Sequence, residues 1–531
     1  MEKALDMGKT SVTGSFRLLI GVVASTLIVA ISSIILGRLL STADYGLYGI
    51  VLVPSTLIIL FRDWGVNTAM IKYIASLRAS NRDEEIHDVI IAGLVFEIAS
   101  GIALSFVSLG LATFIAQTVF RKPESASYIA IASASIISGS LLAASQGGFI
   151  GFERMGLNSF TLILQAVVQA TVGPVLVFLG YRVLGAVVGY TLGLATAGTI
   201  GVATLYILMF RPLRKKRTKN SDITKTLKTM LTYGTPLAVG SILTGILAQI
   251  YIFIAVPITS NATYGSYLVA SNFTVLLSFF ATPIATVLFP AFAKIDPKHE
   301  IELAKTIFTS SIKYASILVV PVAMFLIFLS GPTVGTLYGV KYTYAPFFLT
   351  IMAITGLLVL LGSLTVGGFL QGLGETRTVM KMNVLTVIVG VPLSIILIPP
   401  FGITGLIITS IFDGVPSLIW VLHWTWKHYG TRADLQSSAK ILAASAIAAF
   451  AAYLPTWFLN TVDWIKLVIG LLIFMLVYVE GAPVIGAVDL TDINNLRALF
   501  SGMGALTKIV NIPLNAAEKA ARIKTTTKKA P

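Results

Sequence analysis

The sequence predicts an all-α membrane protein that crosses the bilayer about fourteen times, and three observations lead to this prediction. Of the 531 residues, 56% are hydrophobic and 11% are charged, whereas a soluble domain carries about 25% charged residues. Mean hydropathy is +0.88. A bilayer-crossing helix needs roughly 20 apolar residues, and the chain contains fourteen runs of this kind. The composition therefore excludes a water-soluble globular protein of this length.

The fourteen runs are bounded by charged residues or by Gly and Pro, which punctuate apolar helices. They lie at residues 16–40, 46–70, 87–117, 128–149, 160–180, 184–209, 232–258, 266–292, 310–330, 345–370, 379–399, 403–424, 440–459 and 464–483. The first run is too long for a signal-peptide core and no small-residue cleavage site follows it, so we expect it to remain as a span.

The distribution of positive charge predicts the orientation of these spans. When the loops are assigned to alternating sides, 31 of the 38 Lys and Arg residues fall on the side of the N-terminus and 6 on the other. Positive loops stay in the cytoplasm, so we expect a multi-pass protein of the cell membrane with both termini cytoplasmic. The densest basic segment, residues 211–228, is expected to anchor this topology on anionic lipid headgroups. Nothing in this segment indicates a nucleic-acid partner.

Short sequence echoes at offsets of 219 and 220 residues indicate an internal duplication. Residues 43–48 read ADYGLY and residues 262–267 read ATYGSY, while GGFI at 147–150 corresponds to GGFL at 367–370. An even number of spans per half gives parallel repeats, which in transporters enclose a substrate site near the midplane. The domains predicted from these observations are an N-terminal six-helix lobe (1–210), a basic linker (211–231), a second six-helix lobe (232–425), two extra helices (426–483) and a basic cytoplasmic tail (484–531).

The order of several motifs resembles the polysaccharide transporter (oligosaccharide flippase) branch of the multidrug/oligosaccharidyl-lipid/polysaccharide flippase superfamily. The resemblance implies two six-helix lobes around a central cavity, two extra helices, and transport of a polyprenyl-linked glycan. Gln249 stands where relatives often carry an acidic residue. The segments that carry the resemblance are Leu36-Gly37-Arg38-Leu39-Leu40, Ala43-Asp44-Tyr45-Gly46-Leu47-Tyr48, Asp63-Trp64-Gly65, Tyr233-Gly234-Thr235-Pro236, Tyr264-Gly265-Ser266-Tyr267, Leu288-Phe289-Pro290 and Leu490-Thr491-Asp492-Ile493.

Two ionisable residues lie at matching depths inside predicted spans. Arg62 in the second span is about 12 Å and Glu97 in the third about 15 Å from the inner ends, at 1.5 Å per residue. Charges at membrane depth are costly and mark functional sites. One interpretation is that Arg62 faces the cavity and binds the diphosphate of the lipid carrier, for which a guanidinium is well suited. The other is an Arg62–Glu97 ion pair that only joins two helices, and both can hold together.

Further polar residues inside the spans are candidates for substrate binding or ion coupling. Gln165 and Gln169 share one face of the fifth span, where they either line a polar cavity or bond a neighbouring helix. Asp63 follows Arg62 and should point to another side of the helix. Asp413 in the twelfth span either couples transport to an ion gradient or is a neutral, hydrogen-bonded carboxyl. Gln249 completes the candidate substrate-binding set.

The predicted function is transport of a lipid-linked oligosaccharide across the membrane by alternating access. The expected partners are the polyprenyl-linked glycan, membrane lipids and glycan-assembly enzymes. No cofactor or metal is expected, because the chain has no cysteine, no phosphate-binding GxxxxGK[ST] loop and no metal-ligand spacing. A cation-coupled small-molecule exporter of the same superfamily is the alternative. A membrane glycosyltransferase or polymerase would need acidic groups on a large outer loop, and the longest such loop is only about 331–344.

Overall fold

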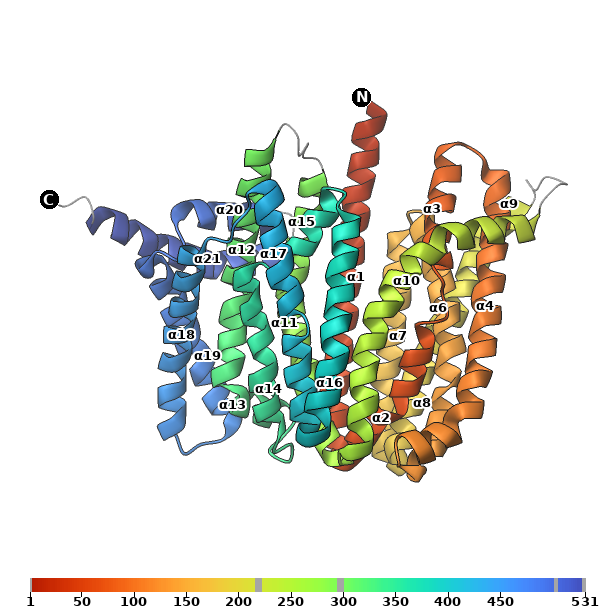
Figure 1. The fold of residues 1–531 in the computed structure, drawn as a ribbon, viewed down its shortest axis with the longest axis horizontal. Coiled ribbons are helices and arrows are strands. Elements are labelled where there is room, and N and C mark those ends of the chain that lie inside the picture. The colour runs from red at the N-terminus through yellow and green to blue at the C-terminus, as the bar shows by residue number, and fades with distance from the viewer. Residues whose placement is uncertain (1, 215–221, 294–299, 501–504, 528–531) are drawn as a thin grey trace. The chain divides into compact units, whose positions relative to one another are not determined.

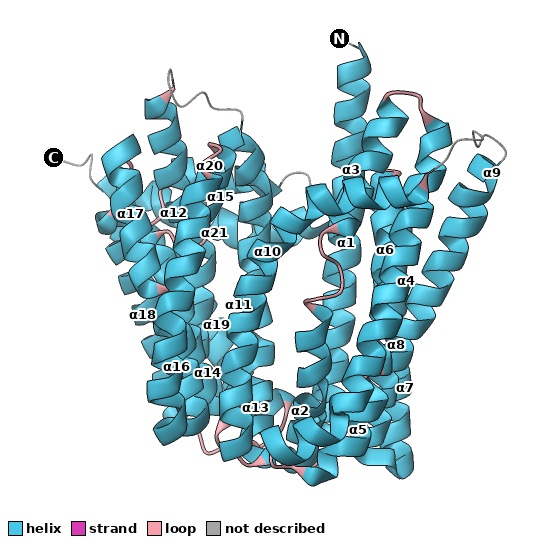
Figure 2. Cartoon of the chain, turned by 45° about the vertical axis from the view of Figure 1, so that its right-hand side comes forward, coloured by secondary structure: helices cyan, strands magenta, loops and turns pink. Residues whose placement is uncertain are grey.

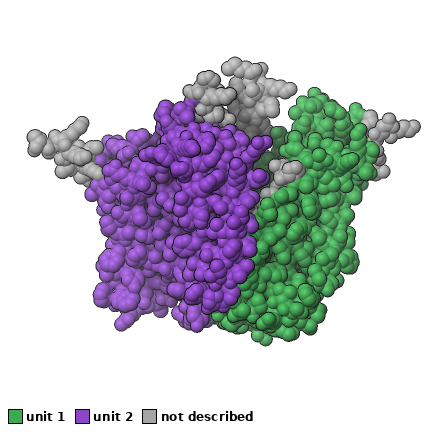
Figure 3. Space-filling model, viewed as in Figure 1, with its two compact units in different colours: residues 1–265 green, residues 266–531 purple. Residues whose placement is uncertain are grey.

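The computed structural model describes residues 2–214, 222–293, 300–500 and 505–527. Within these ranges the chain forms helices joined by short loops and no strand (Figure 2), which confirms the all-α prediction. The chain divides into two compact units, residues 1–265 and 266–531 (Figure 3). The boundaries predicted for the lobes, linker, extra helices and tail stay a prediction.

In the described part of the first unit there are ten α-helices and the first turn of an eleventh, and Figure 1 shows their arrangement. They are α1 (Glu2–Leu39), α2 (Thr42–Ile59), α3 (Val66–Ala79), α4 (Asp83–Phe114), α5 (Ala126–Ala132), α6 (Ala134–Gly151), α7 (Met155–Leu176), α8 (Arg182–Leu205), α9 (Arg211–Arg214), α10 (Ile223–Ala255) and the start of α11 (Asn261–Ala293). Short 3-10 or π segments extend several of them, namely η1 (Ile115–Val119), η2 (Pro123–Ser125), η3 (Val177–Tyr181), η4 (Tyr206–Phe210) and η5 (Val256–Ile258).

Among the residues of the second unit that the structure describes are the rest of α11 and ten further α-helices. They are α12 (Ile301–Phe328), α13 (Ser330–Leu337), α14 (Ala345–Ala353), α15 (Val366–Gly372), α16 (Thr376–Phe412), α17 (Val415–Tyr429), α18 (Leu435–Phe458), α19 (Asp463–Ile485), α20 (Leu490–Phe500) and α21 (Ala505–Thr527), with the 3-10 segment η6 (Ile354–Leu361) after α14.

Nine segments of the described residues are long and apolar enough to cross a membrane, and the bent pair Ala345–Leu361 with Val366–Gly372 makes a tenth. Two of the nine, Met155–Leu213 with 59 residues and Thr376–Tyr429 with 54, far exceed the roughly 20 residues of one crossing. Each contains a glycine with positive φ, Gly180 at 96° and Gly402 at 55°, where the chain departs from helical geometry. The protein is therefore a multi-pass membrane protein, and the count of fourteen spans stays a prediction.

Several predicted spans are interrupted among the described residues, and two of them show the largest breaks. The apolar run 46–70 forms α2 and α3 with non-helical residues between them. The run 345–370 forms α14, η6 and α15, with a bend of 44° between the two halves. Hydropathy averaged over a whole span does not detect such breaks, because the few polar residues at them, such as Arg62 and Asp63, are outweighed by the apolar residues on either side.

Each unit has its own buried core, and large apolar side chains cover much of the outside. Val66 of α3, Ile90 of α4, Phe149 of α6 and Met230 of α10 belong to one core cluster of the first unit. Outside, Phe178 is 79% exposed. In a water-soluble protein an extensive apolar surface would promote association, whereas in a bilayer it contacts lipid.

The two copies of the duplicated motif begin helices in the same way and contact each other. In α2 the Ser41 hydroxyl accepts a hydrogen bond from the Asp44 N–H at 3.0 Å, and before α11 the Ser260 hydroxyl accepts one from the Thr263 N–H at 3.1 Å. A side chain on the glycine of either copy would overlap the other copy's backbone. The overlaps would be Gly46 with the Asn261 carbonyl and Gly265 with the Thr42 carbonyl. With an offset of 219 residues, these two contacts are equivalent.

Candidate functional site

The candidate site is centred on a break in the second span. Helix α2 ends at Ile59 and α3 begins at Val66. Between them Trp64 and Gly65 have positive φ values of 45° and 78°. An exposed backbone break is tolerated inside a membrane only where protein or a water-filled cavity satisfies the freed groups. The Asp63 carboxylate satisfies one of them by accepting a hydrogen bond from the Asn67 N–H at 2.7 Å.

Helix α10 crosses this break and runs antiparallel to the second span. A side chain at Gly65 would overlap the carbonyl of Gly234 in α10. Further along, Gly245 packs against the side chain of Leu60. The absence of side chains at these glycines lets the two backbones approach closely.

Gln249 lies further along the same contact between α10 and α2. The Thr56 hydroxyl donates a long hydrogen bond of 3.5 Å to the Gln249 side-chain oxygen, in addition to a bond of 2.8 Å to the Val53 carbonyl. Gln249 is half-buried. The structure therefore places this candidate beside the second span, one helical turn from the break.

Arg62 and Glu97 form an ion pair at the break. The Arg62 Nε lies 3.1 Å from the Glu97 Oε2, with the Arg62 side chain 14% exposed and that of Glu97 fully buried in α4. The Arg62 Nη1 points toward Gly139 of α6, where an added Cβ would come within 3.3 Å. The pairing expected from the matching depths is thus present. The guanidinium retains donors that Glu97 does not use.

Asp63 also interacts with the Glu97 side chain, although neither Glu97 oxygen receives a hydrogen bond of regular geometry. The expectation that Asp63 points away from the pair is wrong, because it assumed a continuous helix and the helix ends at Ile59. The break therefore gathers one guanidinium and two carboxylates. If both acids were ionised, the cluster would carry a net negative charge, which favours uptake of a proton or cation.

The two glutamines of the fifth span lie elsewhere in the same unit. Gln169 is buried in α7, and its backbone and Cβ face Gly193 of α8, where an added Cβ would come within 3.0 Å. Gln165 is half-buried one turn away. Among the described residues, no hydrogen bond joins either glutamine to Arg62 or Glu97. Their role in substrate binding stays a prediction.

Asp413 lies at the break between α16 and α17, within the twelfth predicted span and in the other unit. It follows α16 at the bend before α17, is half-buried, and donates its N–H to the Thr409 carbonyl at 2.8 Å. A carboxyl at a helix break inside an apolar span is suitably placed for ion coupling, and this role too stays a prediction.

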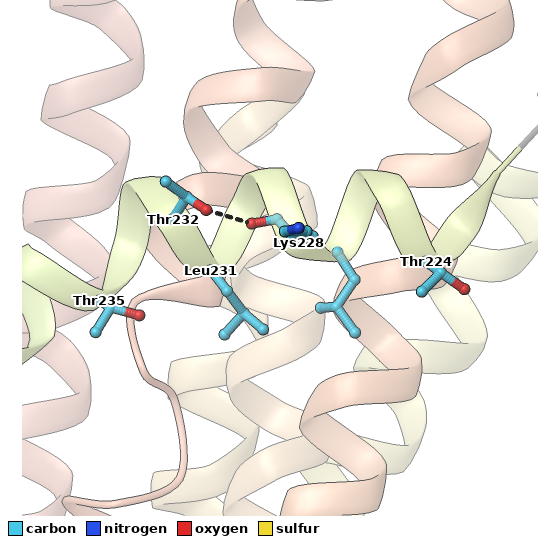
Figure 4. A pocket seen from close by; sticks show the side chains of 6 residues that line it. Thr224, Lys228, Leu231, Thr232 and Thr235 are labelled. Atoms are coloured by element: carbon cyan, nitrogen blue, oxygen red, sulfur yellow. Dashed lines mark hydrogen bonds between the residues drawn. The ribbon is translucent and has the colours of Figure 1, made fainter.

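A hollow of about 540 Å³ lies along one face of α10, near the predicted inner end of the span. Figure 4 shows its lining side chains at helical spacing, with the Thr232 hydroxyl donating to the Lys228 carbonyl at 2.8 Å. Lys228 is exposed and is the one cation among the lining residues, which are Thr224, Leu227, Lys228, Leu231, Thr232 and Thr235. An ammonium with nearby hydroxyls suits a phosphate-bearing headgroup.

An ion pair that the sequence did not predict lies at the predicted outer end of the first unit. Arg182 donates to both oxygens of Asp44, with distances of 2.9 to 3.1 Å. This contact joins the start of α2 to the turn between α7 and α8. A signal was present, because Asp44 belongs to the duplicated motif and its counterpart Thr263 carries no charge. Nearby, burial lowers the pKa of Lys122, partly offset by Glu124, and its ammonium donates to the Thr259 carbonyl at 2.9 Å.

Two family models match this chain. The model described as "Polysaccharide biosynthesis protein" matches residues 11–296, and the model described as "Lipid II flippase MurJ" matches residues 156–477. Each match covers more than half of the chain.

Two curated archaeal proteins are similar in sequence. The probable low-salt glycan biosynthesis flippase Agl15 of Haloferax volcanii is 23% identical over 214 residues, which is 40% of this chain and 45% of that protein. An uncharacterized membrane protein of Methanocaldococcus jannaschii is 23% identical over 385 residues, 70% of this chain and 75% of that protein. The chain thus matches less than half of the length of the Haloferax relative.

Solved structures of transporters share the fold. The lipid II flippase MurJ in an inward closed conformation has a TM-score of 0.69 at 16% identity, covering 87% of this chain and 97% of that one. An inward-facing multidrug resistance MATE transporter of the MOP superfamily has a TM-score of 0.61 at 16% identity, covering 78% and 98%. At these identities the similarity concerns the fold alone.

Proposed function

Because this chain belongs to the polysaccharide and oligosaccharide flippase branch of the MOP superfamily, we propose that it moves a lipid-linked oligosaccharide across the cell membrane by alternating access. The observation that carries the proposal is the Arg62 guanidinium at a break in the second span, paired with a buried carboxylate. The polyprenyl tail would stay in the bilayer while the sugar and diphosphate pass through the protein. This route avoids the cost of several kcal/mol for each polar group left without a partner in lipid.

In this proposal the diphosphate and Glu97 compete for Arg62. Guanidinium and phosphate form bidentate hydrogen bonds, so a phosphate that reaches Arg62 displaces the carboxylate. Glu97 is fully buried, and a buried carboxylate without a cation is strongly disfavoured. Proton uptake by Glu97 then accompanies substrate binding, and Asp63 is the second carboxylate available to the same proton. Gln249, Gln165 and Gln169 would contact the polar part of the substrate, and Asp413 would couple ions in the second unit.

The proposed orientation keeps both termini in the cytoplasm, with the basic segment 211–228 against anionic lipid. Glycan-assembly enzymes would supply the substrate on the inner side and use it on the outer side. The driving force is then the membrane potential or a proton gradient, since each charge moved contributes about 2.3 kcal/mol per 100 mV.

A flux assay tests this proposal. The purified full chain is reconstituted into proteoliposomes with a polyprenyl-diphosphate-linked oligosaccharide that carries a fluorescent label. A membrane-impermeant quencher reports how much labelled sugar reaches the outer leaflet. We expect faster loss of protected label than in protein-free liposomes, and a further change in rate when a pH gradient is imposed.

The similarity to MATE transporters favours one other candidate, a cation-coupled exporter of small molecules. The same proteoliposomes loaded with a cationic dye distinguish the two. Dye export driven by a sodium or proton gradient, without movement of the lipid-linked sugar, would contradict the flippase proposal.

A further inference from the structure

A larger cavity lies entirely within the second unit, where α12, α13 and α14 meet α18 and α19. Its volume is about 820 Å³, within the range of 300 to 1,000 Å³ typical of small-ligand sites. In the predicted topology it opens at the outer surface. The residues that bear on its chemistry are Phe328, Tyr342, Tyr453, Trp457, Asp463 and Lys466.

One wall of this cavity is a series of aromatic rings. Phe328 and Tyr453 meet edge to face with ring centroids 6.0 Å apart, and Tyr453 and Trp457 follow at 5.7 Å. Trp457 is 68% exposed, so much of its ring remains available to a ligand. Aromatic side chains of this kind offer a large apolar surface at little entropic cost.

An acid and a base from α19 line the same cavity. Asp463 and Lys466 are three residues apart and share one helix face. Both are half-buried, and among the described residues neither side chain has a hydrogen bond or an ion pair. The Asp463 carboxylate fills the space that a side chain at Gly335 would need, which fixes its position. Polar groups that are partly desolvated and without partners are available to hydrogen-bond a ligand.

We propose that this cavity binds the pyranose rings of a neutral glycan. The C–H face of a pyranose packs on an aromatic ring, while its hydroxyls donate to a carboxylate and accept from an ammonium. A lipid tail would gain nothing from the acid and the base. A nucleotide or free phosphate would meet a site with no net positive charge. The choice of a glycan rests on the proposed function, whereas binding itself is measured without transport.

The test is saturation-transfer NMR on the full chain in lipid nanodiscs. Sugar-based detergents are avoided because their headgroups would occupy the cavity. The probes are maltotriose, cellotriose and triacetylchitotriose. We expect at least one to bind, and Trp457→Ala to weaken that binding about two- to tenfold, the range that corresponds to aromatic contacts of 0.5 to 1.5 kcal/mol. The matched control is Phe458→Ala, because Phe458 is 78% exposed and does not line the cavity.

The polar groups are tested in the same way. Asp463→Asn and Lys466→Gln should each weaken binding of the trisaccharide, while Lys440→Gln at the other end of α18 should leave it unchanged. A competition arm with the same trisaccharide on a polyprenyl diphosphate separates two sources of the sugar. Displacement assigns the cavity to the lipid-linked substrate, and lack of displacement assigns it to free glycan; either supports a sugar site.

Three results would overturn the proposal. They are failure of all three probes to bind, equal affinities for the Trp457 and Phe458 variants, and saturation transfer to phosphatidylglycerol headgroups in place of sugar. Absence of sugar binding by the unchanged protein, together with normal flux in proteoliposomes, would reject this cavity alone. Absence of flux by the unchanged protein, together with normal sugar binding, would reject the proposed function alone.

Discussion

From the Arg62–Glu97 pair we predict how the free energy of unfolding changes in Arg62→Met, Glu97→Gln and the double variant. At 3.1 Å the Coulomb attraction is about 5 kcal/mol with an effective dielectric constant near 20, and desolvation of both groups offsets much of it. Arg62→Met alone leaves a fully buried carboxylate unpaired, which costs about 3 to 5 kcal/mol. The double variant removes both charges, and replacing a buried pair by uncharged groups is often neutral.

Two measurements on each variant separate a structural from a substrate-binding role. Thermal unfolding in nanodiscs should show a lowered midpoint for Arg62→Met and a midpoint near that of the unchanged protein for the double variant. Flux of lipid-linked oligosaccharide should be lost in Arg62→Met and in the double variant, because neither protein retains the guanidinium that binds the diphosphate. The matched control is the exposed pair Arg82–Glu85, whose double neutral variant should change stability by less than about 1 kcal/mol.

Normal flux in the double variant would refute this reasoning. It would show that Arg62 only neutralises Glu97 and joins two helices, and the diphosphate site would have to lie elsewhere. Normal stability of the Arg62→Met protein would refute the premise that the Glu97 carboxylate stays charged and without a partner when Arg62 is removed.

Two further predictions concern stability. Gly65→Ala forces a side chain into the Gly234 carbonyl at a position with positive φ, so we expect a clear fall in the midpoint of thermal unfolding. The control is Gly110→Ala, which should leave the midpoint unchanged because nothing lies within 4 Å of the added Cβ. Equal midpoints for the two variants would contradict the contact between Gly65 and Gly234. Asp434 caps α18 through hydrogen bonds from the Ser437 side chain and backbone, which lower its pKa below 3.8. Asp434→Ala should therefore cost about 1 kcal/mol at neutral pH. Because the folded-state pKa is the lower one, this difference should persist above pH 4 and vanish as the pH falls through that lower value, and a constant difference down to pH 2 would contradict the assignment.

Much of the fold could be predicted from the sequence because a bilayer imposes simple rules. Apolar runs of sufficient length must be helical, and the described residues of the predicted spans are helical apart from breaks such as those at 60–65, 362–365 and 413–414. The break between Ile59 and Val66 was not predicted, because the two charged residues in it, Arg62 and Asp63, lie within an otherwise apolar run and were read as polar residues of one continuous helix. Only the sequence Asp63-Trp64-Gly65 hinted at it, through a glycine able to adopt positive φ.

One part of the candidate site could be predicted, because charged residues at the same depth in neighbouring spans tend to contact each other. Counting residues from the span ends was enough to pair Arg62 with Glu97. It failed for Asp63, whose direction depends on the local backbone and not on helical spacing. The cavity beside Trp457 was not predicted at all, since its lining comes from helices far apart in the sequence and shows no motif.

The reciprocal glycine contact has an evolutionary consequence. Gly46 meets Asn261, and the equivalent Gly265 meets Thr42, so the surface that each copy offers is complementary to itself. A half-length chain carrying one copy of the motif could make the same pair of contacts with a second molecule of its own kind, as symmetric dimers do. Fusion of two such genes would preserve the interface without new contacts. After such a fusion both glycines would have to be retained, since a larger residue at either position is blocked by the backbone of the other copy.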